Sequence, residues 1–171
     1  MLVAQTPVNE GAAIIQTFEG SVSAYVKQQK AARQNLPFAK TASKKGEMLR
    51  QQHLLAERVR SFRPDAKRGD IFTADVSTEM RRLLALAMQG ANASRIRKSL
   101  NSGEPVALAL KVNAPFPDKL PLQSTPPTLL LNLPRLPAEL DYRFVGRALV
   151  LRDTAANLIV DFIPDALPAP K

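Results

Sequence analysis

The hydrophobic positions of residues 10–33 repeat at intervals of three and four, the spacing that places side chains on one face of an α-helix. Asn9 stands where a helix N-cap is expected, and Pro37 follows the last turn. The sequence therefore predicts an amphipathic helix over residues 10–33. Its expected buried stripe is Ile14 or Ile15, Phe18, Val22, and Tyr25 or Val26.

Three more helices are predicted in the N-terminal part of the chain, at about 46–62, 74–89 and 93–101. Thr73 or Asp75 is suited to cap the helix at 74–89, and Gly90 is suited to follow its C-cap. The expected buried residues are Met48, Leu54, Leu55, Val59 and Phe62 in the first of these helices, Val76, Met80, Leu83, Leu84 and Ala87 in the second, and Ile96 and Leu100 in the third.

After Gly103 the pattern changes to a period of two. Residues 106–112 alternate in the way that predicts a β-strand. Residues 114–127 contain five prolines, which exclude a helix or a central strand and predict an extended loop. Residues 128–133 are a candidate for a second strand.

The C-terminal segment has the clearest strand pattern. Leu140–Val145, Ala148–Arg152 and Leu158–Ile163 are predicted strands, and Gly146 lies in a tight turn between the first two. Their short connections predict antiparallel neighbours, which form a β-meander.

These elements predict an α+β fold, in which about four N-terminal helices pack on a C-terminal antiparallel β-meander of four to five strands. We expect a flexible N-terminus at 1–9, one domain at 10–164 and a tail at 165–171. Within the domain, residues 10–101 are expected to be helical and residues 104–164 to be rich in strands, with a Pro-rich loop at 114–127.

Charge is unevenly distributed along the chain. The formal net charge is +9, and all of the excess lies before residue 101, since the remainder has 7 basic and 7 acidic residues. Lys27–Arg68 alone holds 12 basic and 3 acidic residues, a local field that favours anionic partners. A solvated Lys/Arg face that keeps the protein soluble is the more general interpretation of such a charge run. The candidate contact residues are Lys40, Lys44, Lys45, Arg63, Lys67 and Arg68.

Composition excludes several kinds of site. The absence of Cys rules out thiolate chemistry and disulfides, and His53 as the only His cannot form a His-based zinc site. No G-x-S-x-G or Gly-rich phosphate loop is present, and no apolar run is long enough for a transmembrane helix. We therefore expect no catalytic residue, no cofactor and no metal ion.

Two groups of charged residues have simple structural interpretations. Asp65, Asp70, Asp75 and Glu79 are explained by helix capping and local ion pairs, with an Asp/Glu-based hydrolase site as the alternative. On the meander, opposite charges facing each other across strands predict pairs on the solvent side. The residues concerned are Asp141, Arg143, Arg147, Arg152, Asp153 and Asp161.

Residues 80–101 offer an alternative function. They are predicted to form a helix, a short turn at Gly90 and a second helix that carries Arg95, Arg97 and Lys98. This order is similar to a helix-turn-helix, whose second helix enters the DNA major groove. The interpretation as a simple corner between two helices is the more general one, so nucleic acid is not the favoured partner.

The segment DYRFVGRALVLRDTAANLIVD, from Asp141 to Asp161, resembles the C-terminal part of a group of uncharacterised secreted bacterial proteins. Leu129–Pro134 and Gly69–Phe72 resemble the same group. The resemblance implies a periplasmic or secreted protein and transfers no catalytic residue. Val3 and the two residues after it are similar to the end of a cleaved secretory signal, and a cytoplasmic protein is the alternative.

Together these observations predict a non-catalytic exported domain that binds a protein or an anionic envelope component through its basic helical face. The alternatives are DNA binding through residues 80–101 and an enzyme with an Asp/Glu site.

Overall fold

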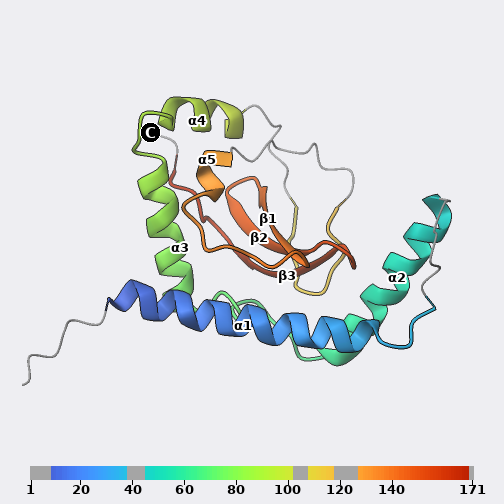
Figure 1. Ribbon diagram of the computed structural model, residues 1–171. Coiled ribbons are helices and arrows are strands. Elements are labelled where there is room, and N and C mark those ends of the chain that lie inside the picture. The colour runs from blue at the N-terminus through green and yellow to red at the C-terminus, as the bar shows by residue number, and fades with distance from the viewer. Residues whose placement is uncertain (1–8, 38–44, 102–107, 118–126, 170–171) are drawn as a thin grey trace, which may run out of the picture.

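The computed structural model describes residues 9–37, 45–101, 108–117 and 127–169, which form an α+β protein with helices first and an antiparallel sheet last (Figure 1). The elements in chain order are α1 (Glu10–Arg33), α2 (Lys45–Phe62), α3 (Ala74–Ala87), α4 (Ala93–Asn101), α5 (Pro127–Leu130), β1 (Leu140–Val145), β2 (Ala148–Asp153) and β3 (Leu158–Ile163).

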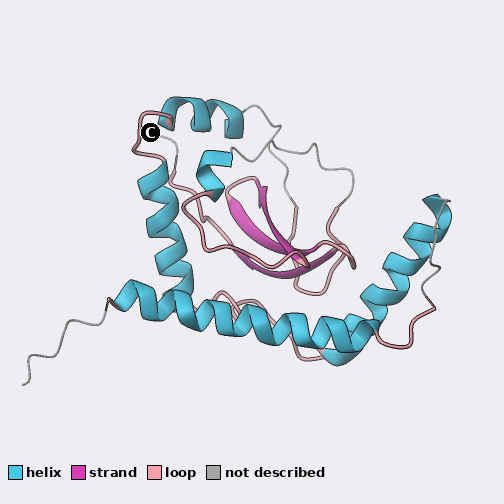
Figure 2. Ribbon diagram, viewed as in Figure 1, coloured by secondary structure: helices cyan, strands magenta, loops and turns pink. Residues whose placement is uncertain are grey.

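The long helix α1 crosses below the sheet and joins the other helices to each other (Figure 2). The helices that α1 contacts are α2 and α3, and α3 in turn contacts α5. In Figure 1, α3 rises beside the sheet from one end of α1, whereas the first turns of α2 extend away from the sheet at the other end. The helices thus surround the sheet on one face and at one side.

The sheet has the order β1-β2-β3, and both strand pairs are antiparallel, as the sequence predicts. Gly146 in the turn between β1 and β2 has φ = +57°, a left-handed conformation that suits glycine in a tight hairpin. The β1–β2 register begins with Leu140 opposite Asp153. The β2–β3 register shifts between Leu151 and Arg152, so the meander is not fully regular.

Both faces of the sheet are covered. Leu149 and Leu151 of β2 belong to the main core, which they share with buried residues of α1, α2 and α3. Val150 and Ile159 point to the opposite face, where Phe116 packs on them in a smaller cluster. Alternate residues of one strand therefore face two separate apolar layers, as the two-residue period of a strand requires.

The segment 108–117 adds to the open edge of β3. The Asn113 N–H donates to the Ile159 carbonyl at 2.9 Å, and the Ile159 N–H donates to the Ala114 carbonyl at 2.9 Å. The predicted strand at 106–112 is wrong in its described part, because residues 108–112 are irregular and the left-handed Asn113 (φ = +64°) turns the chain before the edge contacts begin. Residues 106 and 107 lie outside the described part of the chain.

The predicted strand at 128–133 is also wrong. Pro127 starts the short helix α5, where the N–H group that proline lacks would have no partner within the helix. The buried Leu129 packs this helix against the core. The described residues therefore hold three strands and five helices, instead of four to five strands and about four helices.

The helices at 10–33, 46–62, 74–89 and 93–101 are confirmed to within two residues at their ends, but some details of them are wrong. Asn9 is the N-cap of α1 without a capping bond from its side chain, whereas Thr73 caps α3. The C-cap of α3 is Met88, so Gly90 lies one position beyond the residue that follows the C-cap. Met48 and Phe62 of the predicted α2 stripe are 59% and 44% exposed.

Candidate functional site

The loop between α2 and α3 is fixed to the sheet by a buried carboxylate. Asp161 of β3 has no exposed surface, and it accepts backbone N–H groups from Gly69 at 3.0 Å, Ile71 at 2.9 Å and Phe72 at 2.8 Å. The Phe162 N–H donates to the same side chain at 2.8 Å. A buried carboxylate is stable only when such donors replace its lost hydration, so the position of this loop on β3 is closely determined.

The first cation of this loop, Arg63, turns inward. Its guanidinium carbon lies 4.9 Å from the centroid of the Tyr25 ring. Its Nη1 and Nη2 donate at 3.4 Å to the Asn113 side chain and to the Val160 carbonyl. Burial lowers the pKa of Arg63, an effect that nearby anionic groups oppose. Arg63 thus helps to attach the loop to both α1 and β3.

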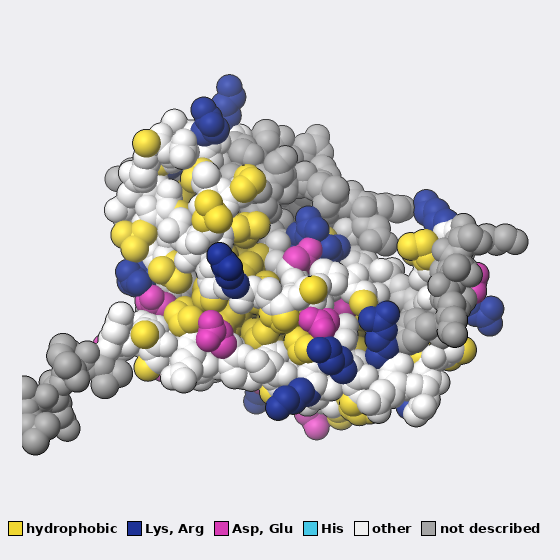
Figure 3. Space-filling model, viewed as in Figure 1, with side chains coloured by type: hydrophobic (Ala, Val, Ile, Leu, Met, Phe, Trp, Pro, Cys, Tyr) yellow, Lys and Arg dark blue, Asp and Glu magenta, His cyan; other side chains and the backbone are white. Residues whose placement is uncertain are grey.

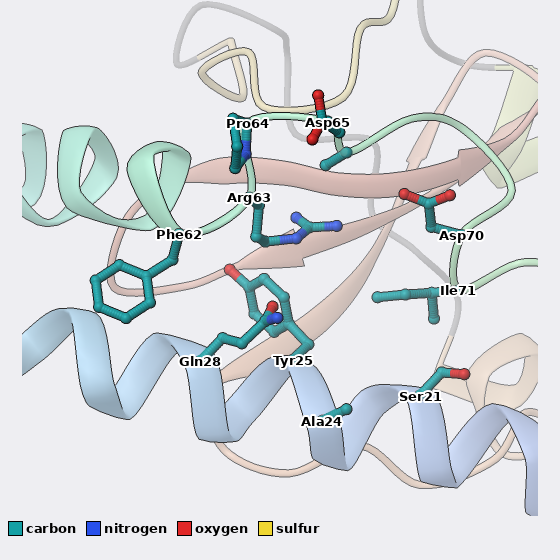
Figure 4. A pocket seen from close by; sticks show the side chains of 11 residues that line it. Ser21, Ala24, Tyr25, Gln28, Phe62, Arg63, Pro64, Asp65, Asp70 and Ile71 are labelled. Carbon is teal, nitrogen blue, oxygen red and sulfur yellow. The ribbon is translucent and has the colours of Figure 1, made fainter.

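Arg63 lines a pocket of about 420 Å³ together with Tyr25, Phe62, Asp65 and Asp70. Figure 4 shows the Arg63 side chain extended over the Tyr25 ring, with the Asp70 carboxylate ahead of it. Two carboxylates and one guanidinium line the same space, so this pocket does not offer an excess of positive charge.

A second buried carboxylate joins α1 to the sheet. The Tyr25 hydroxyl donates to Asp153 Oδ2 at 2.6 Å, and the N–H groups of Ala155 and Ala156 donate to Oδ1 at 2.9 and 2.7 Å. Burial and the Asp153 carboxylate raise the pKa of Tyr25 far above its usual value, so the phenol stays protonated as a donor.

The other cations of the loop lie on a groove of about 480 Å³, which we call the basic groove. Lys67 and Arg68 come from the loop, and Lys111 comes from the segment that runs along β3. All three are exposed, and none of the described residues that line the groove carries a carboxylate. Its remaining lining residues are Ala66, Leu110, Val112 and Phe162.

The structure separates the predicted contact residues. Lys67 and Arg68 share the basic groove, whereas Arg63 lines the neighbouring pocket. Lys45 is exposed at the start of α2, and the 18 residues of this helix span about 27 Å, so it lies far from the loop. Lys40 and Lys44 lie outside the described residues.

Sequence reasoning missed Lys111, because the second half of the chain has no net charge. The alternation Leu110, Lys111, Val112 was the available signal, since it places one cation between two apolar residues. Its partner cations are more than forty positions earlier in the chain, and only the contacts along β3 bring them together.

Two of the four acidic residues near α3, Asp70 and Glu79, have the local partners that were predicted. Glu79 and Arg82 form a two-bond ion pair at 2.6 and 2.7 Å, which lowers the pKa of Glu79. Asp70 accepts the Lys67 N–H at 2.9 Å. Among the described residues, no group of three or more Asp, Glu or His side chains could hold a metal ion.

The predicted pairs on the meander are only partly present. Asp141 accepts hydrogen bonds from Arg143 at 2.9 Å and Arg152 at 2.7 Å, in the expected positions on the sheet. The prediction is wrong for Asp153 and Asp161, which have no exposed surface. Their partners are backbone and hydroxyl donors from other elements instead of cations across the strands.

The helices of the alternative DNA-binding segment are α3 and α4, which meet at the top of the molecule in Figure 1. Ile96 of α4 is buried, and Arg97 Nη2 donates to the Met88 carbonyl at 3.5 Å. Arg95 and Lys98 are exposed. Arg97 is exposed as well, so the structure leaves all three cations of α4 on the surface.

Comparisons with protein-family models, with curated proteins and with solved structures give no significant match. In the part of the chain that the structure describes, no helix is both long enough and apolar enough to cross a membrane.

Proposed function

We propose that this protein is a non-catalytic exported domain that binds an anionic component of the cell envelope through the basic groove. The observation that carries the proposal is the convergence of Lys67, Arg68 and Lys111 on one hollow, whose lining has no carboxylate in the part of the chain that the structure describes. A concave surface with charge of one sign concentrates the field and attracts counter-charged ligands.

Several other cations have their charge offset by a near partner. Arg82 pairs with Glu79, Arg147 with Asp165, and Lys30 with Glu139. Paired groups contribute little to the field at a distance, whereas the groove cations have no such carboxylate among the lining residues within the described ranges. The groove is therefore a more favourable anion site than the cation count alone indicates.

The exported location rests on the resemblance of the C-terminal segment to secreted bacterial proteins. The non-catalytic role rests on composition, since the chain has no Cys and a single His. His53 lies on α2 with its Nε2 3.3 Å from Glu57, away from the lining of the basic groove.

Vesicle flotation tests the proposal. Wild-type protein is mixed with vesicles that contain phosphatidylglycerol or with vesicles of phosphatidylcholine alone. The groove variant carries Lys67→Gln, Arg68→Gln and Lys111→Gln. The control variant carries Arg95→Gln, Lys98→Gln and Arg135→Gln, which remove the same charge from exposed residues outside the groove lining.

We expect wild type and control to float with anionic vesicles, with binding that weakens as salt rises, and the groove variant to stay unbound. Equal loss in the two variants would show that net charge alone governs binding, and would contradict the proposal. Binding to a DNA duplex that is lost in the Arg95/Lys98/Arg135 variant but not in the groove variant would favour the alternative function at residues 80–101.

A further inference from the structure

The basic groove has two chemically different walls. Lys67, Arg68 and Lys111 supply the charged wall, and Leu110 and Phe162 contribute to the apolar one. A site for a free inorganic anion gains nothing from partly exposed apolar side chains. A ligand that carries its charge on an apolar body would use both walls.

The apolar wall is continuous with a packed layer. Phe162 and Leu110 pack against the smaller core cluster, which contains Val150 of β2 and Ile159 of β3. Val112 lies beside them and is only 8% exposed. The sheet thus supports the apolar wall, which is already formed before a ligand binds.

The two walls meet at Arg68. Its guanidinium carbon lies 5.8 Å from the centroid of the Phe162 ring, close enough for a cation–π contact. An anionic group bound to Arg68 would therefore place whatever it is attached to beside the Phe162 ring. The Asp161 carboxylate, next to Phe162, holds the loop of Arg68 in this relation to β3.

We propose that the ligand of the basic groove is an amphiphilic anion, in which one phosphate-type headgroup is joined to a hydrocarbon chain. This inference rests on the proposed function and specifies its ligand class. The headgroup binds Lys67, Arg68 and Lys111, and the first part of the chain lies on Leu110 and Phe162. A volume of about 480 Å³ is in the usual range of small-molecule sites.

Titration calorimetry with a ligand series tests the inference. The ligands are inorganic phosphate, butyl phosphate, octyl phosphate below its micelle concentration, and the uncharged octyl glucoside. Affinity is expected to rise by about threefold to fourfold for each methylene that the wall buries. Octyl phosphate should therefore bind more than about tenfold more tightly than inorganic phosphate, and octyl glucoside should not bind measurably.

Two variants measure the contribution of the apolar wall to binding separately from that of the cations. Leu110→Ser and Phe162→Ala are expected to weaken octyl phosphate binding by about tenfold while inorganic phosphate binding stays unchanged. Leu110 is partly exposed, so its variant remains informative if Phe162→Ala does not fold. Leu131→Ser is the matched control, because this leucine is 81% exposed and is not part of the groove lining.

The outcomes distinguish the two proposals. Equal affinity for inorganic phosphate and octyl phosphate, or equal affinity for octyl phosphate and octyl glucoside, would overturn the inference. Binding to anionic vesicles without binding of octyl phosphate would overturn it and leave the proposed function intact. Failure of both vesicles and soluble anions to bind would overturn the proposed function itself.

Discussion

At the residue scale, two buried carboxylates join the helical half of the chain to the sheet. Asp153 accepts the Tyr25 hydroxyl of α1, and Asp161 accepts three N–H groups of the loop between α2 and α3. The strand pattern could not predict this, because it places Asp141, Asp153 and Asp161 in one class of polar strand residues. The donors that the helical half supplies to Asp153 and Asp161 lie some ninety or more positions earlier in the chain. Only the assembled fold therefore shows which carboxylates are buried.

Replacement of Asp161 tests the first of these connections. Asp161→Ala leaves several buried N–H groups without an acceptor, so we expect it to lower the free energy of unfolding by about 2–4 kcal/mol. Asp141→Ala is the matched control on β1, and loss of its partly exposed ion pairs should cost about 1 kcal/mol or less. Urea unfolding measures both. Equal effects of the two substitutions would contradict the role of Asp161.

Both tyrosines of the protein, Tyr25 and Tyr142, are predicted to resist ionisation. Burial is the main cause that raises the pKa of each, and the Asp153 carboxylate adds to the effect at Tyr25. A pKa that is higher in the folded than in the unfolded state gives stability that is complete below about pH 10 and is lost as the pH rises above that value.

Spectrophotometric titration should therefore show no tyrosinate in folded protein just above pH 10, and tyrosinate should appear together with unfolding at higher pH. Tyr25→Phe should make stability less dependent on alkaline pH, while at neutral pH it costs about 1–3 kcal/mol through the lost bond to Asp153. A normal tyrosine titration in protein that remains folded would contradict the prediction.

At the element scale, α2 divides into two halves. Leu55 and Val59 are buried in the main core, whereas Met48 and Leu49 one or two turns earlier are 59% and 50% exposed. Periodicity places Met48, Leu55 and Val59 on one stripe, because it records spacing along the helix and not where the neighbouring elements end. In Figure 1 the first turns of α2 project beyond the rest of the fold.

Alanine substitutions should reveal this division. Leu55→Ala removes a fully buried side chain, so it should lower the free energy of unfolding by about 2–5 kcal/mol. Met48→Ala lies on the same predicted stripe, and it should change stability by about 0.5 kcal/mol or less. Thermal or urea unfolding compares the two. A large loss in Met48→Ala would show that this half of α2 is packed in solution.

Elements with a strong local period were predictable, and elements that depend on distant partners were not. The α1 stripe and the three strands of the meander agree with their predicted bounds within a residue, because each forms its own periodic surface. Residues 128–133 contain enough leucine to suggest a strand, yet Pro127 and the core contact of Leu129 give a short helix. The segment at 108–117 follows β3 through contacts that its own sequence does not encode.

At the scale of the whole molecule, the charge division along the chain does not match the division in space. The basic groove combines Lys67 and Arg68 of the basic half with Lys111 of the neutral half. Two of the three groove cations, Lys67 and Arg68, were therefore predictable from the concentration of charge. The third cation and the apolar wall were not. Their arrangement follows from the contacts of both loops with β3, where Gly69 bonds to Asp161 and Asn113 bonds to Ile159.

The helices and the sheet also share one core, and this predicts how the molecule unfolds. Phe18 of α1 stacks on Phe72 of the loop at 5.6 Å, and both belong to the same cluster as Leu151 of β2. Neither half can retain this packing alone, since each buries its apolar face on the other. We expect urea to unfold both in a single cooperative transition.

Circular dichroism follows the helices, and amide exchange of β2 and β3 follows the sheet, so the two measurements should give the same free energy of unfolding. Phe18→Ala on α1 and Leu151→Ala on β2 should each lower it by about 2–5 kcal/mol in both measurements, although each residue lies in only one half. If Phe18→Ala lowered the helix transition and left exchange in the sheet unchanged, the two halves would be independent folding units. The bonds of Tyr25 to Asp153 and of the loop to Asp161 would then connect two units that unfold separately.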